Sequence, residues 1–375
     1  MISVGALYIH VPFCRRKCLY CDFASMPTSA DDARLRLYME QLGHQLEESC
    51  NAGLLRECRT AYVGGGTPTL LGADLLGELI ARVRRTCPQV RELTFEANPD
   101  SLSNEVLAAA LGAGATRISI GVQSFCDEEL EALGRLHTAE VARRRVRNAV
   151  RSGLSVSVDL MCAVPCQTDD SWQRTLDEAV GLGVGHVSVY PLTIEDGTEF
   201  GAQYGRHVPA WNDEDVQADR MEQAQRTLIA SGFERYEVAS YARLGMDCKH
   251  NQAYWTGVPY LGLGTGAAGM LLPGQCDAVR KVLTWFPNID ATAARVRYET
   301  QSREVEFLGA REAWAEDLML GMRMSRGVDA QLVPANVLEN LEQRGLVRRE
   351  GGRMVPTHAG WLLGNELYGA LWDLA

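Results

Sequence analysis

Six short runs rich in β-branched and other apolar residues alternate with helical segments over the first half of the chain. Apolar character is nearly continuous in several runs, which is typical of parallel strands covered on both faces. Segments such as 33–50 and 74–87 repeat apolar residues at helical spacing, and Gly114 and Gly153 stand where helices are expected to end. We expect an α/β fold in which strand–helix units with right-handed crossovers form a partial (βα)6 barrel; a flat doubly wound sheet is the alternative. The predicted strands are Ala6–Val11, Arg59–Gly64, Glu92–Ala97, Arg117–Val122, Ser155–Leu160 and His186–Pro191.

Residues suited to binding and catalysis stand at the carboxyl ends of these runs. Three cysteines follow the first run, and the stretch "GGGTPT" follows the second. The ends of the later runs carry Glu96, Gln123, Asp159 and Tyr190. Parallel strands of a barrel end at one edge, and barrel enzymes place their sites there. The sequence therefore predicts a functional site at this edge.

The three cysteines, Cys14, Cys18 and Cys21, have the spacing C-x3-C-x2-C. Four thiolates would complete a structural zinc site or a fully ligated cluster, whereas three leave one iron of a [4Fe–4S] cluster open. An open iron can chelate an amine and a carboxylate, and S-adenosylmethionine carries both. Two alternatives are a zinc site that recruits His10 and a redox pair of Cys18 and Cys21. The position at the head of a βα barrel favours the cluster.

Composition narrows the class of protein and its partners. The chain has 375 residues, of which 46% are hydrophobic and 23% charged, as in ordinary globular proteins. Its formal net charge of −11 disfavours a nucleic-acid partner, because phosphate binding needs clustered Lys and Arg. Eleven cysteines without an apparent export signal are typical of reduced thiols. We expect a cytoplasmic protein without a transmembrane segment, with peripheral membrane contact left open.

The remaining chain is expected to form two smaller units. The aromatic-rich segment 232–257 shows no clear helical period, so we expect an extension strand and loop against the open side of the barrel. From Gly309 the pattern of helix, helix, short hairpin and closing helix predicts a small winged-helix-like α+β domain, interpreted as a cap in preference to a DNA-binding unit. The predicted domains are a core at 1–231, an extension at 232–300 and a C-terminal domain at 301–375.

Several motifs, in order along the chain, carry a resemblance to a known family. They include "LYIHVPFC", "AYVGGGTPTLL", "FEANPDSL", "RISIGVQSF", "LTIEDGTEF" and "HNQAYWTG". Together they resemble the radical S-adenosylmethionine (SAM) superfamily, in the branch that contains oxygen-independent coproporphyrinogen III oxidase and the HemW haem chaperones. The resemblance covers essentially the whole chain. It implies a radical SAM core with a [4Fe–4S] cluster on Cys14, Cys18 and Cys21, an electron donor to that cluster, and bound SAM.

The resemblance also implies which residues contact the cofactors. A glycine-rich stretch would meet the methionyl amine, because backbone without Cβ atoms can approach a ligand closely. Carboxylates suit the ribose hydroxyls or the ammonium, and Arg suits the carboxylate. The alternatives are a simple tight turn for the glycines and a solvated helix residue for the arginine. The implied positions are Tyr8 beside the cluster, Gly65, Gly66 and Thr67 in the glycine-rich stretch, and Glu96, Gln123, Arg135 and Asp159 as polar contacts.

Two features favour a haem chaperone over the oxidase within this branch. The oxidase carries a further cysteine two residues after the third, where this chain has Phe23, and it has a long N-terminal arm, whereas thirteen residues precede Cys14 here. Neither feature assigns a catalytic residue. The resemblance thus implies a protein that binds haem and delivers it to acceptor haem proteins, such as respiratory ones. A coproporphyrinogen III oxidase-like enzyme is the alternative, and a radical SAM enzyme acting on haem ranks third.

The segment "HNQAYW", from His250 to Trp255, matches a motif linked to haem binding in HemW proteins. A neutral imidazole is a good axial ligand of haem iron, and Tyr254 and Trp255 offer flat apolar surface to a porphyrin. His250 is therefore the expected haem ligand, with Cys248 as a rival. The alternative is a histidine that is hydrogen-bonded and purely structural.

Overall fold

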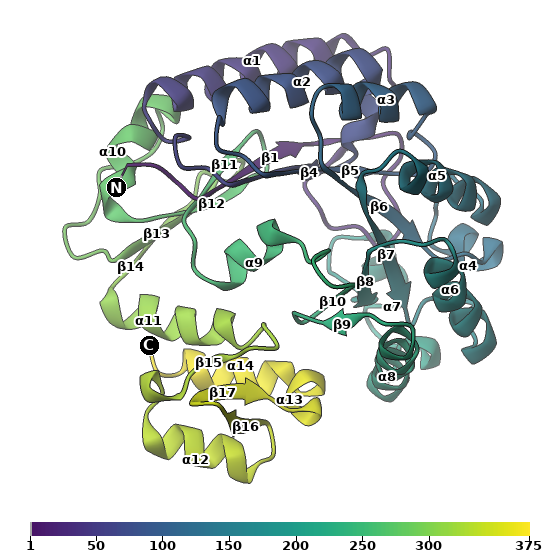
Figure 1. Cartoon of the computed structure of the whole chain (residues 1–375), viewed down its shortest axis with the longest axis vertical. Coiled ribbons are helices and arrows are strands. Elements are labelled where there is room, and N and C mark those ends of the chain that lie inside the picture. Colours follow the sequence, from purple (N-terminus) through teal and green to yellow (C-terminus); the bar gives the residue numbers. More distant parts are fainter. Residues whose placement is uncertain (1) are drawn as a thin grey trace.

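The computed structural model describes residues 2–375 and contains the predicted parallel strands at the centre of one 12-stranded sheet. These strands are neighbours in chain order, and each pairs in parallel with the next. The sheet curves into an arc but does not close (Figure 1), so the partial-barrel prediction is confirmed. The strands are β1 Ala6–Val11, β4 Thr60–Gly65, β5 Glu92–Ala97, β6 Arg117–Gln123, β7 Ser155–Cys162 and β8 His186–Pro191.

Helices cover the convex face of the arc, where their buried apolar stripes meet the sheet (Figure 1). Several begin at a residue whose side chain accepts a hydrogen bond from the first turn, as Ser103 and Thr138 do. Gly114 and Gly153 follow helices with φ of 102° and 87°, as expected of residues that end a helix in the left-handed region. The helices on this face are α1 Ala33–Asn51, α2 Gly72–Thr86, α3 Asn104–Gly112, α4 Asp127–Ala132, α5 Ala139–Arg151, α6 Asp169–Gly181 and α8 Glu214–Ala230. Helix α7 Glu199–Tyr204 follows β8 and belongs, through Phe200, to a separate small apolar cluster; short 3₁₀ turns lie at Pro68–Leu71 and Ala210–Asn212.

The sheet continues beyond the predicted strands at both edges, where the sequence predicts only an extension strand and loop. Beside β1, strand β11 pairs in parallel, and three antiparallel strands follow it. Beside β8, two short antiparallel strands complete the other edge. The additional strands are β11 Tyr260–Leu263, β12 Ala268–Leu271, β13 Arg295–Glu299 and β14 Val305–Leu308 on one side, with β10 Ser240–Ala242 and β9 Glu234–Arg235 on the other; helix α10 Pro273–Val282 connects β12 to β13.

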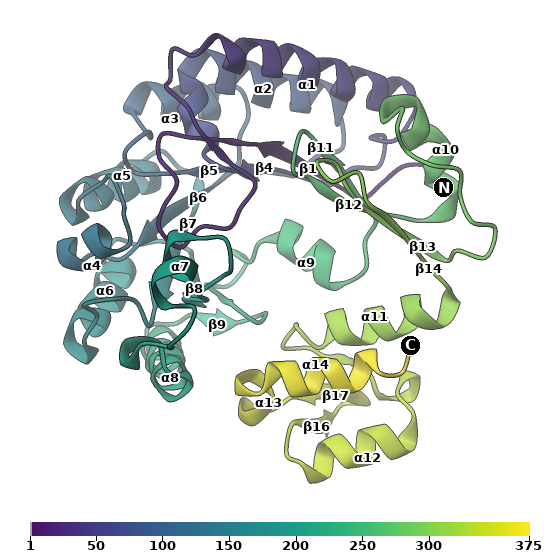
Figure 2. The same cartoon turned by 180° about the vertical axis from the view of Figure 1, so that it is seen from behind.

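The segment expected to be strand and loop contains a helix, which corrects that prediction. Helix α9, Lys249–Trp255, carries the HNQAYW sequence and lies within the arc of the sheet, as Figures 1 and 2 show from opposite sides. Its first turn is held by Glu92, whose carboxylate accepts hydrogen bonds from the backbone N–H groups of Lys249 and His250 at 3.0 and 2.9 Å. A cap supplied by a residue so distant in sequence leaves no local helix signal.

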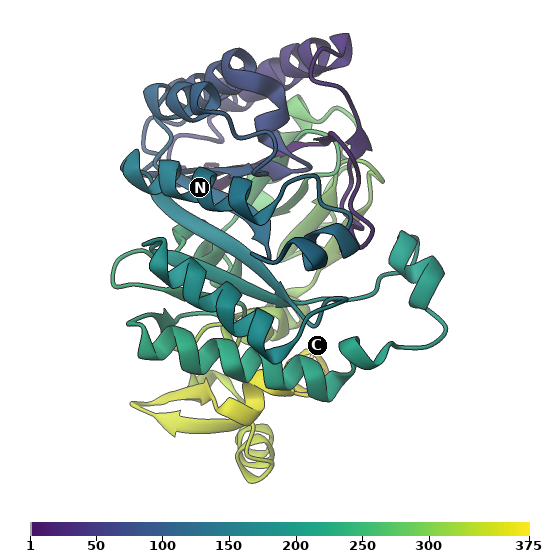
Figure 3. The same cartoon turned by 90° about the vertical axis from the view of Figure 1, so that its right-hand side faces the viewer.

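The C-terminal residues form a unit with an apolar cluster of its own, which Figure 3 shows at one end of the molecule. The expected order of helix, helix and hairpin is present, and two short helices stand where one closing helix is expected. The predicted boundary at residue 301 falls between β13 and β14 of the large sheet. No helix in residues 2–375 is long and apolar enough to cross a membrane. The elements are α11 Ala310–Gly321, β15 Val328–Asp329, a 3₁₀ turn at Ala330–Leu332, α12 Ala335–Gln343, β16 Val347–Glu350, β17 Arg353–Pro356, α13 His358–Leu362 and α14 Gly364–Trp372.

Candidate cofactor site

The cysteine loop lies at the carboxyl edge of the sheet, between two short paired strands, β2 Phe13–Cys14 and β3 Met26–Pro27. Cys14 is buried, and Cys18 and Cys21 are partly exposed; all three are free thiols. Burial raises the pKa of Cys21 to about 11, so any metal group bound there would have to displace a thiol proton.

The contacts around the cysteine loop distinguish between a zinc site and a [4Fe–4S] cluster. Within residues 2–375, no three His, Cys, Asp or Glu side chains converge on a point as the ligands of one ion do. A cubane cluster binds each thiolate at a different iron, so its ligands need not converge. Moreover, both ring nitrogens of His10 are engaged, Nδ1 with the Tyr8 hydroxyl at 2.9 Å and Nε2 with the carbonyl of Ala24 at 2.7 Å. These contacts disfavour a zinc site completed by His10 and fit the cluster.

The glycine-rich stretch lies directly against the cysteine loop. The N–H of Thr67 donates to the Phe13 carbonyl at 2.7 Å, and the Thr67 hydroxyl lies 3.4 Å from Cys14 Sγ. A Cβ atom on Gly66 would come within 2.7 Å of the Phe13 carbonyl oxygen, and Gly65 has a φ of 112°. Both positions therefore need glycine, one for close approach and the other for its backbone conformation.

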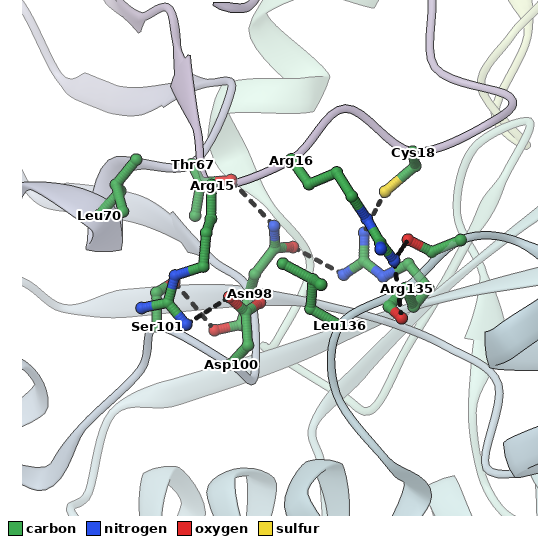
Figure 4. A pocket seen from close by; sticks show the side chains of 11 residues that line it. Arg15, Arg16, Cys18, Thr67, Leu70, Asn98, Asp100, Ser101, Arg135 and Leu136 are labelled. Carbon is green, nitrogen blue, oxygen red and sulfur yellow. Dashed lines mark hydrogen bonds and ion pairs between the residues drawn. The ribbon is translucent and has the colours of Figure 1, made fainter. Parts of the chain in front are cut away.

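Arg135 reaches the cysteine loop from the segment after α4, as Figure 4 shows. Its Nη1 donates to Cys18 Sγ at 3.3 Å, and its Nη2 donates to Asn98 Oδ1 and the Gly121 carbonyl, both at 2.7 Å. Asn98 in turn donates from Nδ2 to the Thr67 hydroxyl at 2.8 Å. The buried Nε of Arg135 has no hydrogen-bond partner within the described chain, which leaves one donor for a ligand such as a carboxylate.

Two acidic side chains line the inner face of the sheet near its carboxyl edge. Glu96 accepts hydrogen bonds from the Tyr62 hydroxyl at 2.8 Å and from the Gly65 N–H at 3.0 Å. Burial raises the pKa of Glu96 to about 7, although the bond from Tyr62 opposes this rise. Asp159 accepts from the Ser119 hydroxyl at 3.0 Å, and burial raises its pKa too. Both buried carboxyls keep lone pairs that could accept further hydrogen bonds from hydroxyl or ammonium groups.

Gln123 stands at an irregularity in the sheet. The pairing of β6 with β7 shifts between Gly121 and Gln123, and Gln123 has a φ of 67°. A bulge of this kind turns a side chain away from the regular pleat, and strained backbone of this kind clusters at functional sites. Tyr8 lies on the same inner face, with its ring centroid 6.3 Å from that of Tyr62.

Contacts at the carboxyl edge bring most of the sequence-predicted residues together around the cysteine loop. Two participants are not singled out by the sequence, although both lie inside quoted motifs: Asn98 in "FEANPDSL" and Tyr62 in "AYVGGGTPTLL". Their only sequence signal is proximity to Glu96 and to the glycines. The partners of Asn98 and Tyr62 are brought to them by tertiary contacts between different strands, which local sequence does not reveal.

His250, the haem ligand expected from the motif, is held at the opposite end of the strands from the cysteine loop. Its Nδ1 is 2.9 Å from the hydroxyl of Thr60, the first residue of β4, and its Nε2 is 2.8 Å from the hydroxyl of Tyr254. The side chain is fully buried, and burial lowers its pKa to about 3. In this conformation both ring nitrogens are occupied, as in the structural alternative.

The rival ligand and the motif's tryptophan are also engaged. Cys248 is buried, with its Sγ 3.4 Å from Asn251 Oδ1 and 3.6 Å from Glu92 Oε1. Trp255 Nε1 donates to Glu237 Oε2 at 3.0 Å, and the guanidinium of Arg323 lies 5.2 Å from its ring centroid. These contacts tie α9 to both the sheet extension and the C-terminal unit.

Comparison with known proteins gives this arrangement its family. A model described as the Radical SAM superfamily matches residues 8–179. The protein named "Heme chaperone HemW" in Mycobacterium tuberculosis is 34% identical over 369 residues, covering 96% of this chain and 93% of that protein. Its namesake in Bacillus subtilis is also 34% identical, covering 97% and 98%.

A solved structure shares the fold over nearly the full length. Coproporphyrinogen III oxidase (HemN) from Escherichia coli, described as a radical SAM enzyme, superimposes with a TM-score of 0.77 at 20% identity, covering 99% of this chain and 91% of that one. At this identity the likeness concerns the fold alone. The relatives that match almost end to end decide the family: the chain belongs to the HemW family of the radical SAM superfamily.

Proposed function

We propose that this protein binds haem and delivers it to acceptor haem proteins, on a scaffold that holds one [4Fe–4S] cluster and SAM. The observation that carries the proposal is the near full-length similarity to proteins named as haem chaperones. The sequence adds that Phe23 stands where the oxidase resemblance places a further cysteine.

The cluster would be held by Cys14, Cys18 and Cys21. When bound, it supplies an open iron and a one-electron reductant beside the carboxyl edge of the sheet. The chain's own residues support the thiolates: the Thr67 hydroxyl lies beside Cys14, and Arg135 donates to Cys18. Hydrogen bonds and positive charge at the sulfurs stabilise the more negative, reduced cluster.

SAM would lie between the cysteine loop and the inner face of the sheet. The free Nε of Arg135 suits its carboxylate, and Glu96 and Asp159 suit the ammonium and ribose hydroxyls. The glycine-rich stretch would bring backbone groups to the amine, and Gln123 and Tyr8 would complete the contacts.

Haem ligation by His250 requires one ring nitrogen to be released, from Thr60 or from Tyr254, and the buried ring to become accessible. Its lowered pKa keeps the imidazole neutral, which is the form that binds iron. We therefore propose His250 as a ligand of a conformation in which α9 has moved. Replacing His250 by Ala should speed haem loss without changing the cluster spectrum. If the variant loses haem at the same rate as the parent, the haem site lies elsewhere.

The two alternatives to a chaperone differ in their substrate: an oxidase-like enzyme would consume coproporphyrinogen III, and a radical enzyme acting on haem would consume haem. Anaerobic reconstitution of one sample, followed by haem titration and by incubation with coproporphyrinogen III, SAM and a reductant, separates them. We expect stoichiometric haem binding without conversion of coproporphyrinogen. Steady formation of protoporphyrinogen would overturn the chaperone proposal in favour of the oxidase, and loss of the haem macrocycle would favour the radical enzyme acting on haem.

A further inference from the structure

Strand β4 connects the two ends of the barrel interior. Its first residue, Thr60, holds the ring of His250, and its last residue, Gly65, donates its N–H to Glu96 at 3.0 Å. Between them Tyr62 faces the same interior and contacts both groups. Strand β4 therefore contacts both helix α9 and the carboxylate of Glu96, through groups only a few residues apart.

Tyr62 makes two different contacts. Its hydroxyl donates to Glu96 Oε1 at 2.8 Å, and its ring stacks on the imidazole of His250, with centroids 5.2 Å apart and planes inclined by 26°. Burial holds the pKa of Tyr62 well above its ordinary value, so the phenol keeps its proton and acts as the donor.

The imidazole beneath Tyr62 is fixed from three directions. Thr60 and Tyr254 hold its two nitrogens, and the backbone N–H of His250 donates to Glu92 on the neighbouring strand. A fully buried ring with both nitrogens bonded has little rotational freedom. It therefore forms a rigid platform for the aromatic ring stacked on it.

We propose that Tyr62 is a positioning residue through which α9 fixes Glu96 for SAM, so that His250 in this conformation supports the cofactor site. The inference rests on the proposed function, since SAM is the ligand that Glu96 would meet. Each oxygen of Glu96 accepts one bond, from Tyr62 and Gly65, and these bonds set the orientation of the carboxylate. The carboxylate is thereby preorganised, so its remaining lone pairs can bind the ligand without a loss of side-chain conformational freedom.

Removal of the Tyr62 hydroxyl should loosen this carboxylate. In Tyr62→Phe the ring still stacks on His250, but Glu96 loses a hydrogen bond that favours its charged form. SAM should therefore bind about tenfold more weakly, the loss expected of one charge-assisted hydrogen bond. His250→Ala removes the platform and should weaken SAM binding in the same direction, by a smaller factor.

The experiment is calorimetric titration of SAM into anaerobically reconstituted protein, repeated from pH 6 to 8. The pH at which SAM binding is half-maximal should move upward in Tyr62→Phe, which a general packing defect would not produce. Tyr260→Phe is the matched control. The rings of Tyr62, His250, Tyr254 and Tyr260 follow one another in contact, and Tyr260 lies at the far end, with its ring centroid 4.6 Å from that of Tyr254. Iron content and thermal unfolding establish that each variant is folded and loaded.

The outcomes separate this inference from the proposed function. If the parent protein binds no SAM, the proposed function fails, and the role of Tyr62 fails with it. If the parent binds SAM and Tyr62→Phe binds it with the same affinity and pH profile, only the role of Tyr62 is overturned. If Tyr62→Phe does not fold, the SAM affinity of His250→Ala is decisive, and parental affinity in that variant overturns the inference.

Discussion

The Nη1 nitrogen of Arg135 donates a hydrogen bond to Cys18 Sγ over 3.3 Å. A guanidinium at a thiolate neutralises part of the negative charge that a reduced cluster gains, and so raises its reduction potential. The same side chain is anchored by Asn98, which also holds the Thr67 hydroxyl. One small network thus reaches both the cysteine loop and the glycine-rich stretch.

Arg135→Gln should therefore lower the reduction potential of the reconstituted cluster while leaving its iron content intact. The change removes both a positive charge and a hydrogen bond at Cys18. A redox titration followed by electron paramagnetic resonance measures the effect. Arg144→Gln, at an exposed position on α5, provides the control. An unchanged potential in Arg135→Gln would mean that the contact with Cys18 does not tune the cluster.

Gly66→Ala should impair cluster assembly. The added methyl group would lie 2.7 Å from the Phe13 carbonyl oxygen, so the cysteine loop must shift away from the glycine-rich stretch. Gly181→Ala, at the end of α6, is the matched control, because its methyl group would meet no atom of the described chain within 4 Å. Iron and sulfide analysis after reconstitution compares the two. A full cluster in Gly66→Ala would contradict the close approach of the two segments.

Glu96→Gln should stabilise the cluster-free protein increasingly as the pH rises from 5 to 8. The pKa of Glu96 is raised from 4.5 to about 7, chiefly by burial. Between these values the unfolded chain has lost this proton and the folded chain has not, so the contribution of Glu96 to stability falls as pH rises. Melting temperatures at both pH values, compared with those of exposed Glu40→Gln, test this. A pH-independent difference would contradict the raised pKa.

Glu316→Ala should destabilise the attachment of the C-terminal unit by about 3 kcal/mol. Glu316 on α11 pairs with Arg295 on β13, and their side chains are only 4% and 6% exposed. Removing the carboxylate leaves a buried guanidinium with fewer partners. Chemical denaturation and limited proteolysis before residue 310 measure the loss. Glu306→Ala, which breaks an exposed pair with Arg297, should cost less than about 1 kcal/mol. Equal losses would mean that burial of the Arg295 pair is unimportant.

The central strands and the residues at the carboxyl edge of the sheet can be predicted from sequence, because their signals are local. Continuous β-branched runs, glycines after helices and chemistry-bearing residues at strand ends are enough to place Cys14, Gly66 and Glu96 at one edge. Likewise the order of helices and hairpin in the C-terminal unit is confirmed, since apolar spacing and the double glycine of its turn are local features.

Helix α9 and the surroundings of His250 do not follow from sequence, and the reason is physical. The helix has only seven residues, too few to be stable alone, and its first turn is capped by Glu92 from a distant part of the chain. The partner of His250 on β4 is equally distant in sequence. Patterns within one segment carry no information about such partners, so the sequence alone does not decide between a haem ligand and a hydrogen-bonded structural histidine at position 250.

Haem transfer tests the proposed function more directly than any substitution. Anaerobically reconstituted protein is loaded with one equivalent of haem and mixed with the haem-free form of a protein that normally holds a b-type haem, and the absorption spectrum is followed. We predict that haem leaves this protein and that the acceptor gains its native spectrum, faster than from free haem. Failure to bind haem, or retention of haem in the presence of excess acceptor, would contradict the proposed function.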